Sequence, residues 1–464
     1  MKKILLIALI FCWIIPCAAQ LRATVDERIE LTSIVFRIAE IPEYMNNNVP
    51  DYALSIDRWF QPYKNHPLIA FIKKMRTQNR IAYAAVTGSA PYLIIEKGEV
   101  KVNTCKSIEK VDPRWTEEVF DEYVSLLNNF YAQSHFDEFF KSQKVLYSEG
   151  QKAMNGILEQ VDVNWFETFY GKKVGSPSIY LALANGPHNY VLDDPTSLSG
   201  YGIAIGCIID PSALSLFANR IIPVIIHEIG HNFSDPLVEI YWSQVELSFD
   251  KLYDNSRIIL KQYAYGDPNT ALLEWQNNLF MLMYLKEHDP ENYEYNLADM
   301  VRRGFMWMPR SVDFMKNFEE NRSQFKIIED FIPQISDFII YTSERSDRVM
   351  DEYEHIAPYV VNIYPIPNSN LLGYKNLKEI RITFSEAMDT NSKGLEIIQD
   401  ENSPLFVNIN KAYWKDELTL MIPLTGILIP NQEYGIRLNQ NYTNSLRSFG
   451  LAEDIEIKYN TQKL

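Results

Sequence analysis

Apolar residues recur every three or four positions along the first part of the chain. This spacing predicts amphipathic helices over residues 27–41, 49–60 and 67–75. Residues 92–95 are instead rich in β-forming side chains, which predicts a strand. The first hundred residues are therefore expected to combine helices with a small amount of sheet.

A longer helical pattern begins near Asp112-Pro113 and continues, with one restart, to about residue 158. Asp is a favoured helix cap and Pro suits a first turn, so we expect a helix to begin there. The pattern then changes: residues 178–183 and 201–209 are short apolar runs that predict two strands. Glycines within the second run indicate close approach by another segment of backbone.

The second of these strands leads into a predicted helix around residues 221–233. Six mostly apolar residues precede His227 within it, as expected of a helix buried beneath a site. The sequence Ser234-Asp235-Pro236 then predicts the end of this helix and the cap of another, which runs to about residue 263.

A Pro- and Asn-rich stretch at residues 364–370 is interpreted as a domain boundary. Short runs that alternate between apolar and polar residues follow it. They predict strands over residues 379–384, 395–398, 405–409, 417–422, 433–438 and 454–459. This pattern of short, alternating strands favours a β-sandwich. The predicted fold class is therefore α+β, with a mostly helical domain that contains a small sheet, followed by an all-β sandwich.

The candidate chemistry lies in the helix around residues 221–233. His227 and His231 are four residues apart, so both imidazoles leave the same helical face. A catalytic zinc site needs three protein ligands and an open position, and these histidines supply two of the ligands. Glu228, beside the first histidine, is placed to accept a proton from an attacking water. With 7 histidines in 464 residues, chance gives about 0.01 such matches, which favours a metal site over two core histidines.

The third ligand is expected after His231. A histidine six residues further on would complete a metzincin site, but that position is Leu237. We predict Glu274, a single acid in an apolar helical stretch, because a buried carboxylate is costly unless it is paired or bound to metal. Glu239 and Glu246 remain alternatives, although both lie on the helix that directly follows the histidines.

Two kinds of supporting group are also expected. Asn278 lies one turn after Glu274 and is a candidate to hydrogen-bond a ligand histidine. A hydrolase further needs a donor for the oxyanion of its transition state. The candidates for this donor are Tyr190, His188, Tyr265 and Tyr284. With 28 tyrosines in the chain, packing is the ordinary role of any one of them, and we retain Tyr190 as the candidate.

Composition limits the possible partners. The formal net charge is −16, and it becomes −18 when Lys2 and Lys3 are removed with a signal peptide. An acidic chain of this kind is not expected to bind nucleic acid. Cys105 and Cys207 are expected either to form one disulfide or to remain as two buried thiols. Neither has the CxxC spacing of a metal site.

The N-terminus is typical of a secretory signal peptide. Met-Lys-Lys is followed by an apolar run over residues 4–15 and by small residues at Ala18-Ala19. Cleavage after Ala19 leaves Gln20 first and predicts export to the periplasm or the extracellular space. A lipoprotein signal through Cys17 is the alternative, and Pro16 disfavours it. No later segment is judged long and apolar enough to span a membrane.

Four segments, in order, resemble a family of secreted bacterial proteins with a gluzincin-like core, catalogued as a domain of unknown function. They are residues 57–67, residues 185–190, residues 227–231 and Glu274. The resemblance spans roughly residues 25–350 and implies a metallopeptidase fold without naming a substrate. In gluzincins, the edge of a strand before the histidine helix pairs with an extended peptide. Here that strand would be residues 201–208. From this resemblance, a more basic sequence of the Arg-Ala type is expected just after Glu274, and this chain has Gln276-Asn277 there instead.

Residues 382–389, 414–420 and 428–434 resemble bacterial Ig-like domains appended to secreted enzymes and surface proteins. This resemblance implies a structural appendage. The expected organisation is a signal peptide at residues 1–19, a gluzincin-like metallopeptidase domain at residues 20–357 and an Ig-like sandwich at residues 358–464.

The leading hypothesis is a secreted zinc metallopeptidase that acts on a peptide or protein. One Zn²⁺ would be held by His227, His231 and Glu274, with Glu228 as general base. One alternative is a surface or binding protein that keeps a zincin scaffold without turnover. Another is a metal-dependent amidase of a non-peptide substrate, which would use the same residues. The sequence leaves the cleavage specificity and the oligomeric state open.

Overall fold

The computed structural model describes residues 21–105, 107–110, 112–206, 209–349, 357–374, 376–398, 405–426, 428–440, 442–446 and 449–462. The predicted signal peptide, Cys17 and Cys207 lie outside the described residues. Cys105 is a free thiol and is exposed, whereas a buried thiol was one of the two expectations for it. The chain divides into two compact units, Met1–Asn232 and Phe233–Leu464, and each is described by itself. The predicted domain boundary at residue 357 stays a prediction.

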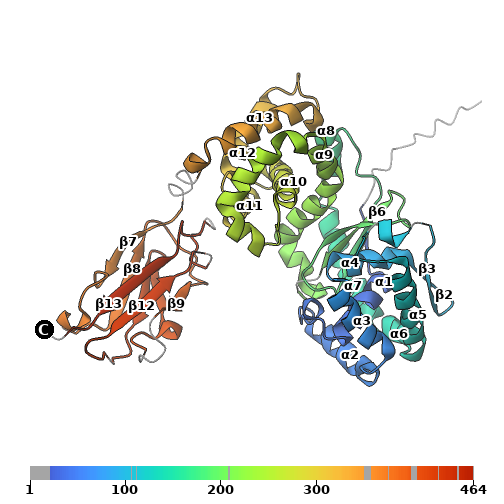
Figure 1. The fold of residues 1–464 in the computed structure, drawn as a ribbon, viewed down its shortest axis with the longest axis horizontal. Helices are drawn as coiled ribbons and strands as arrows, with labels where there is room; N and C mark the ends of the chain where they lie inside the picture. Colours follow the sequence, from blue (N-terminus) through green and yellow to red (C-terminus); the bar gives the residue numbers. More distant parts are fainter. Residues whose placement is uncertain are drawn as a thin grey trace, which may run out of the picture. The chain divides into compact units, whose positions relative to one another are not determined.

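Helices make up most of the first unit (Figure 1). The three helices expected near the N-terminus are present as α1 (Glu27–Ile38), α2 (Pro50–Phe60) and α3 (Pro67–Gln78). The others are α4 (Ala84–Ser89), α5 (Glu117–Gln133), α6 (Phe136–Ser142), α7 (Lys144–Leu158) and α8 (Val163–Tyr170). A hairpin of β2 (Leu93–Glu96) and β3 (Glu99–Val102) contains the strand predicted near residue 93.

The helix predicted to begin at Asp112 begins later. α5 starts at Glu117, and the Thr116 side chain caps it by accepting a hydrogen bond from the backbone N–H of Val119 (3.2 Å). Asp112 instead accepts bonds from the backbone N–H and the guanidinium of Arg114 (3.0 and 2.9 Å). The predicted start is therefore wrong, because an Asp side chain closes a local turn as readily as it caps a helix.

The sheet of the first unit has four strands in the order β1-β4-β6-β5. β4 (Ser178–Ala182) and β6 (Tyr201–Gly206) are the two predicted strands, and they pair in parallel. β1 (Ala23–Thr24) adds to β4, while β5 (Tyr190–Asp193) pairs antiparallel with β6 and forms an outer edge. The prediction that residues 201–208 form the edge strand is therefore wrong, because β6 is paired on both sides.

A close approach of backbone to β6 is confirmed at its last residue. A Cβ at Gly206 would collide with the carbonyl oxygens of Gly186 and His188. Only glycine therefore lets the loop of residues 185–189 lie against the strand. Gly186 has a φ of 75° and packs against the Asn46 side chain, which leaves no room there for another residue.

α9 (Ala218–Gln262) is one helix of 45 residues and runs through Pro236. The prediction that Ser234-Asp235-Pro236 ends one helix and caps another is therefore wrong. Ser234, Leu237 and Val238 are buried, so packing holds the helix together across a residue that lacks a backbone N–H.

The helical stretch Pro211–Gln262 is long and apolar enough to cross a membrane by length and composition, and 44% of its most apolar window is buried. The core helix of a soluble protein meets the same criterion. The expected lack of a membrane span therefore stays a prediction.

The second unit continues with a helical part and a β part. The helices after α9 are α10 (Pro268–His288), α11 (Pro290–Arg302), α12 (Met308–Glu320) and α13 (Ile332–Ser343). α10 packs against α11 and α12, and every residue from Trp275 to Leu285 is buried. α10 is thus the core helix of this part, and most of its buried residues are apolar, with Gln276, Asn277 and Asn278 as polar exceptions.

The β part contains two antiparallel sheets, in the orders β10-β11-β8-β7 and β13-β12-β9. Their strands are β7 (Val360–Tyr364), β8 (Glu379–Phe384), β9 (Leu395–Ile397), β10 (Tyr413–Asp416), β11 (Thr419–Pro423), β12 (Glu433–Leu438) and β13 (Ile455–Asn460). Residues of both sheets, such as Ile382 and Ile436, share one hydrophobic core. The α+β fold class is confirmed. The strand predicted at residues 405–409 is reduced to a bridge between Val407 and Leu424.

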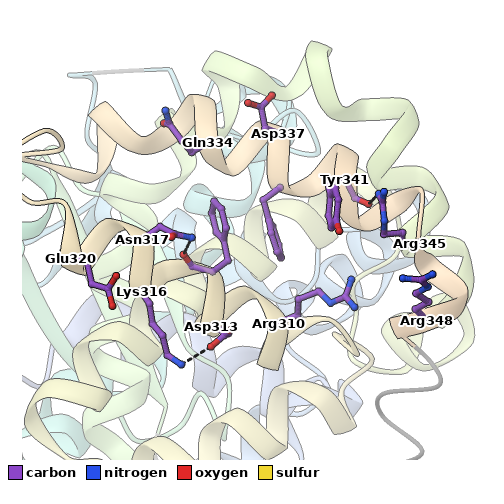
Figure 2. Close-up of a pocket in the computed structure, with 12 residues that line it drawn as sticks. Arg310, Asp313, Lys316, Asn317, Glu320, Gln334, Asp337, Tyr341, Arg345 and Arg348 are labelled. Carbon is purple, nitrogen blue, oxygen red and sulfur yellow. Dashed lines mark hydrogen bonds and ion pairs between the residues drawn. The ribbon is translucent and has the colours of Figure 1, made fainter.

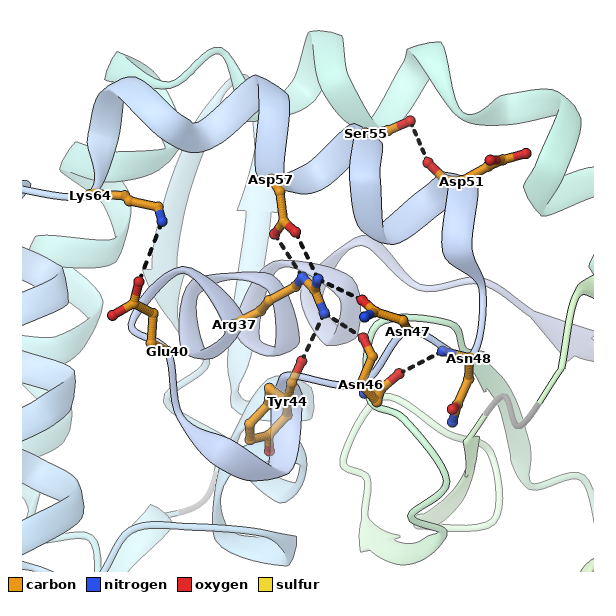
Figure 3. Close-up of polar contacts among 10 residues, drawn as sticks. All are labelled: Arg37, Glu40, Tyr44, Asn46, Asn47, Asn48, Asp51, Ser55, Asp57 and Lys64. Carbon is orange, nitrogen blue, oxygen red and sulfur yellow. Dashed lines mark hydrogen bonds and ion pairs between the residues drawn. The ribbon is translucent and has the colours of Figure 1, made fainter. Parts of the chain in front are cut away.

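A buried arginine organises the loop after α1 (Figure 3). The Arg37 side chain is only 4% exposed, and its guanidinium forms a two-bond ion pair with Asp57 (2.9 and 2.8 Å). It also donates to the backbone carbonyls of Tyr44 and Asn46 and to the Asn47 side chain. Because Asn46 packs against the loop of residues 185–189, this arginine supports that loop as well.

Replacing Arg37 with methionine should lower the free energy of unfolding by about 3 kcal/mol, because two loop carbonyls and the Asp57 carboxylate lose the guanidinium. Urea denaturation measures the change. Lys64→Met is the control: its ion pair with Glu40 is exposed (51% and 55%), so stability should change by less than about 0.5 kcal/mol. Equal effects of the two substitutions would contradict this role of Arg37.

Candidate metal centre

Two histidines of α9 converge on one point. His227 and His231 are one helical turn apart, both are partly buried, and their Nε2 atoms lie 3.0 Å from each other. The two rings are nearly perpendicular, with centroids 4.6 Å apart. Two nitrogens that bind one tetrahedral ion at about 2.1 Å lie about 3.4 Å apart. The observed spacing therefore suits two ligands of one metal ion.

Glu274 of α10 completes this group. One ligand atom from each of His227, His231 and Glu274 lies within 4.8 Å of the other two. The structure thus brings together the three ligands that the sequence predicts. Glu239 and Glu246, the alternatives, are exposed on α9 and are not part of the group found among the described residues.

The donor set fits a catalytic rather than a structural metal site. Two imidazole nitrogens and one carboxylate oxygen are ligands that hold zinc in hydrolases, and three protein ligands leave a position open for water. The same donors also bind other divalent first-row metals, so the residues indicate a class of ion rather than one element.

A buried amide holds α10 against α9 close to these ligands. Gln276 is fully buried, and its Nε2 donates to the backbone carbonyl and to the hydroxyl of Ser234 (3.0 and 3.1 Å). Its Oε1 accepts a hydrogen bond from the Tyr241 hydroxyl (2.6 Å). The sequence only marked Gln276 as a departure from an expected basic residue. The apolar residues around Gln276 were the sequence feature that could have indicated a buried, structural role for it.

Asn278 supports the turn that carries Glu274. Its Nδ2 donates to the backbone carbonyl of Glu274 (2.8 Å), and the residue is 4% exposed. This contact differs from the predicted one, in which Asn278 bonds a ligand histidine. An amide side chain on a helix can reach the backbone carbonyl four residues earlier, and this local bond competes with a longer-range contact.

The predicted general base and the predicted oxyanion donor lie near each other. Glu228 is buried, with 9% of its surface exposed. Burial raises the pKa of Tyr190 well above its ordinary value, and the nearby negative charges, including the Glu228 carboxylate, raise it further. A phenol in this environment stays protonated at neutral pH and can donate a hydrogen bond.

Tyr190 belongs to an aromatic wall, which we define as Tyr83, His188 and Tyr190. The His188 ring lies 6.3 Å from that of Tyr190 in a stacked arrangement, and the Tyr83 ring meets His188 edge-on at 5.4 Å. Burial lowers the pKa of His188, which favours its neutral form. Tyr83 has φ 52° and ψ −126°, a conformation that non-glycine residues rarely adopt. No sequence pattern identified Tyr83.

The loop of residues 185–189, which carries His188, is held by side chains on both sides. Asn185 accepts a bond from the Thr87 hydroxyl and donates to the backbone carbonyl of His188, both at 2.8 Å. The Asn189 side chain accepts from the backbone N–H of Gly206 (2.9 Å). His188 is therefore carried by a fixed loop that leads directly into Tyr190.

A buried carboxyl group fixes the chain just before this loop. Glu30 is fully buried and accepts hydrogen bonds from the Tyr52 hydroxyl (2.6 Å) and from the backbone N–H groups of Leu183 and Ala184 (2.7 and 3.2 Å). Burial raises the pKa of Glu30 to about 7, and these donors act in the opposite direction. Glu30 thus ties α1 to the end of β4.

The two other candidate tyrosines, Tyr265 and Tyr284, lie in different surroundings. Burial and the Glu274 carboxylate raise the pKa of Tyr265 to about 12, which places its phenol near a predicted ligand. Tyr284 is buried and stacks on His288 (4.2 Å between centroids, 10° between planes) near the end of α10. The Tyr284 ring therefore packs against the imidazole of His288.

Comparisons with known proteins name a family but no activity. The family model described as "Domain of unknown function (DUF4932)" matches residues 21–338. No curated protein matches the chain.

The solved structures that match include crystal structures of a bacterial S-layer protein. One, described as S-layer protein rSbsC(31-844), is 10% identical; the match covers 86% of this chain and 46% of that one, with a TM-score of 0.19. Another, the N-terminal part of the bacterial S-layer protein SbsC, is also 10% identical. That match covers 85% of this chain and 79% of the S-layer chain, with a TM-score of 0.18. This chain spans about half the length of the first, at 46%. TM-scores this low do not indicate a shared fold.

Glu274→Gln should weaken the binding of Zn²⁺ at least about 10-fold, because a neutral amide replaces an anionic ligand. Competition with a chromophoric chelator measures the affinity. Glu246→Gln is the matched control, since Glu246 is exposed on α9, and it should bind Zn²⁺ as the unaltered chain does. The assignment of Glu274 fails if both substitutions weaken binding equally.

Proposed function

This chain belongs to the DUF4932 family, and we propose that it is an exported zinc-dependent peptidase with a gluzincin-like core. The observation that carries the proposal is the convergence of His227, His231 and Glu274, with the acid Glu228 beside the first histidine. A structural zinc site has four protein ligands and needs no neighbouring base. Three ligands and a base are the combination that metal-assisted hydrolysis requires.

The chemistry divides between the ion and Glu228. When bound, the ion would polarise the scissile carbonyl and make the attacking water more acidic. Glu228 accepts the proton that this water loses as its oxygen bonds to the carbonyl carbon. Glu228 then passes the proton to the amide nitrogen as the C–N bond breaks, so that the amine leaves in neutral form.

Tyr190 and β5 supply the remaining functions. The Tyr190 phenol, protonated at neutral pH, donates a hydrogen bond to the oxyanion that forms at the carbonyl. β5 begins at Tyr190 and is an outer strand of its sheet. An extended peptide adds to such an edge through backbone hydrogen bonds, which favours a peptide over a small amide as the substrate.

The two ends of the chain fit an exported enzyme. The expected signal peptide at residues 1–19 would direct the protein out of the cytoplasm. The two antiparallel sheets with a shared core support an Ig-like sandwich at residues 358–464, which would act as a structural appendage.

Glu228→Gln should lower the rate of peptide cleavage about 10²- to 10⁴-fold while the protein still binds metal, because the amide cannot accept a proton. Cleavage of a mixed peptide library and metal content by elemental analysis are measured on the same samples. Glu239→Gln, an exposed residue of the same helix, should retain full cleavage and full metal content.

Two results would contradict this proposal. Cleavage that survives in Glu228→Gln would show that another group is the base. Metal binding by the unaltered chain, with no cleavage of any peptide, would instead support a binding protein on the same scaffold or a hydrolase of a non-peptide amide.

A further inference from the structure

Tyr83, in the aromatic wall, occupies a turn position that ordinarily requires glycine. The turn of residues 82–85 is closed by a hydrogen bond from the backbone N–H of Ala85 to the carbonyl of Ala82 (3.2 Å). Tyr83 is the second residue of this turn, and its φ of 52° and ψ of −126° are typical of that position in a type II′ turn. Glycine is favoured there because other residues are strained at positive φ. The chain therefore holds a tyrosine where local structure favours glycine.

Neighbouring side chains hold this strained turn in place. The Arg114 guanidinium donates to the carbonyl of Ala82 (3.3 Å) and is itself bound by the Asp112 carboxylate (2.9 and 2.6 Å). The indole N–H of the fully buried Trp115 donates to the carbonyl of Ala85 (2.8 Å). Backbone strain that several contacts maintain is typical of functional sites.

The Tyr83 side chain contributes little to the core, because 47% of the residue is exposed. Its ring meets the imidazole of His188 at an angle of 88°, with centroids 5.4 Å apart. We call these two rings the aromatic corner. Aromatic rings pair favourably when they are offset-stacked or edge-to-face. A third ring placed in the corner would therefore stack on one ring and meet the other edge-on.

The aromatic corner lies close to the groups expected to act on the substrate. Burial raises the pKa of Tyr190, and the neighbouring Tyr83 phenol and Glu228 carboxylate raise it further, so Tyr190 is near both. The Tyr190 ring also stacks with that of His188. β5 begins at Tyr190, so a peptide that adds to this strand edge would bring a side chain to the corner.

The corner presents neutral rings. Burial lowers the pKa of His188, which favours the uncharged imidazole, and the nearby Glu43 carboxylate opposes this shift. The Glu43 side chain is only 2% exposed and forms a two-bond ion pair with Arg76 (3.2 and 2.8 Å). Because this neighbouring charge is already paired, the corner favours an aromatic side chain over a charged one.

The hollow between α12 and α13, in the second unit, is of a different kind (Figure 2). Its volume is about 700 Å³, and charged side chains line much of it. Asp313 pairs with Lys316 (2.5 Å), and Arg345 pairs with Glu344 (3.4 Å) and lies over the Tyr341 ring. These paired charges do not favour a ligand of either sign.

We propose that Tyr83 and His188 form a subsite that selects peptides with an aromatic side chain next to the scissile bond. This inference rests on the proposed peptidase function and adds a substrate class to it. Tyr83 would determine specificity by contacting the substrate side chain, and it would take no part in bond cleavage. The strain at position 83 then has a reason, because glycine would relieve the strain but would lack the ring.

Two peptides that differ at one residue test this subsite. A bond cleaved in a mixed peptide library is placed in a short peptide with phenylalanine next to it, and in a second peptide with alanine there instead. The zinc-loaded full-length chain should cleave the phenylalanine peptide with a kcat/KM at least about 10-fold higher. Because both rates come from one enzyme sample, their ratio does not depend on the fraction of folded protein.

Variants of Tyr83 separate the ring from the fold. Tyr83→Ala and Tyr83→Gly should each lower the ratio about 5-fold, whereas Tyr83→Phe should keep it within about 2-fold. Tyr83→Gly should also raise the Tm by about 2 °C, because glycine adopts the turn without strain. Arg80→Gly is the matched control: Arg80 is exposed and also has a positive φ (57°), and its replacement should leave the ratio unchanged.

A binding measurement separates the subsite from the peptidase. Zinc-loaded Glu228→Gln is titrated with fluorescently labelled forms of the two peptides, and fluorescence polarisation reports the affinity. It should bind the phenylalanine peptide at least about 10-fold more tightly than the alanine peptide. Combining Glu228→Gln with Tyr83→Gly should lower this preference about 5-fold.

The outcomes differ for the two claims. Cleavage without a preference for phenylalanine, or a preference that survives Tyr83→Gly, would overturn the subsite alone. An equal loss of preference in Arg80→Gly and Tyr83→Gly would also overturn it. A preference in binding that depends on Tyr83, with no cleavage by the unaltered chain, would support the subsite and overturn the peptidase. Neither binding nor cleavage of either peptide would overturn both.

Discussion

The candidate centre depends on a buried amide that ties two helices together. Gln276 lies two residues after Glu274, and its partner Ser234 lies three residues after His231. Since an amide has both donors and an acceptor, Gln276 bonds Ser234 and Tyr241 together without bringing a charge into the core. An arginine at this fully buried position would carry a charge without a partner, and burying that charge would cost roughly several kcal/mol. The absence of the expected basic residue therefore has a structural reason.

A second set of contacts fixes the wall of aromatic residues. Glu30 holds the end of β4, and Asn185 and Asn189 hold the loop that follows. This loop lies against Gly206, where any other residue would collide with its carbonyls. Most of the polar groups that fix the wall are buried, so they hold His188 and Tyr190 in one position. A fixed wall of this kind is what a site needs in order to place a donor at a developing charge.

The sequence predicted the parts of the site that depend on local structure. The spacing of His227 and His231 follows from the helical period, and Glu274 was identifiable because a lone acid in an apolar helix needs a partner. The failures were non-local. Pro236 stays within α9 because tertiary packing outweighs the loss of one hydrogen bond. β5 pairs with β6 and is therefore the edge strand in place of β6. Because β5 is only four residues long, it left no clear signal in the sequence.

The most direct test of the account is an anomalous difference map, recorded at the zinc absorption edge from crystals of the zinc-loaded protein. The account predicts a single peak about 2.0 to 2.2 Å from the Nε2 atoms of His227 and His231 and from a carboxylate oxygen of Glu274. A peak bound by other residues, or a peak near the two histidines with Glu274 turned away, would contradict the proposed ligand set. The absence of any peak would contradict the metal centre itself.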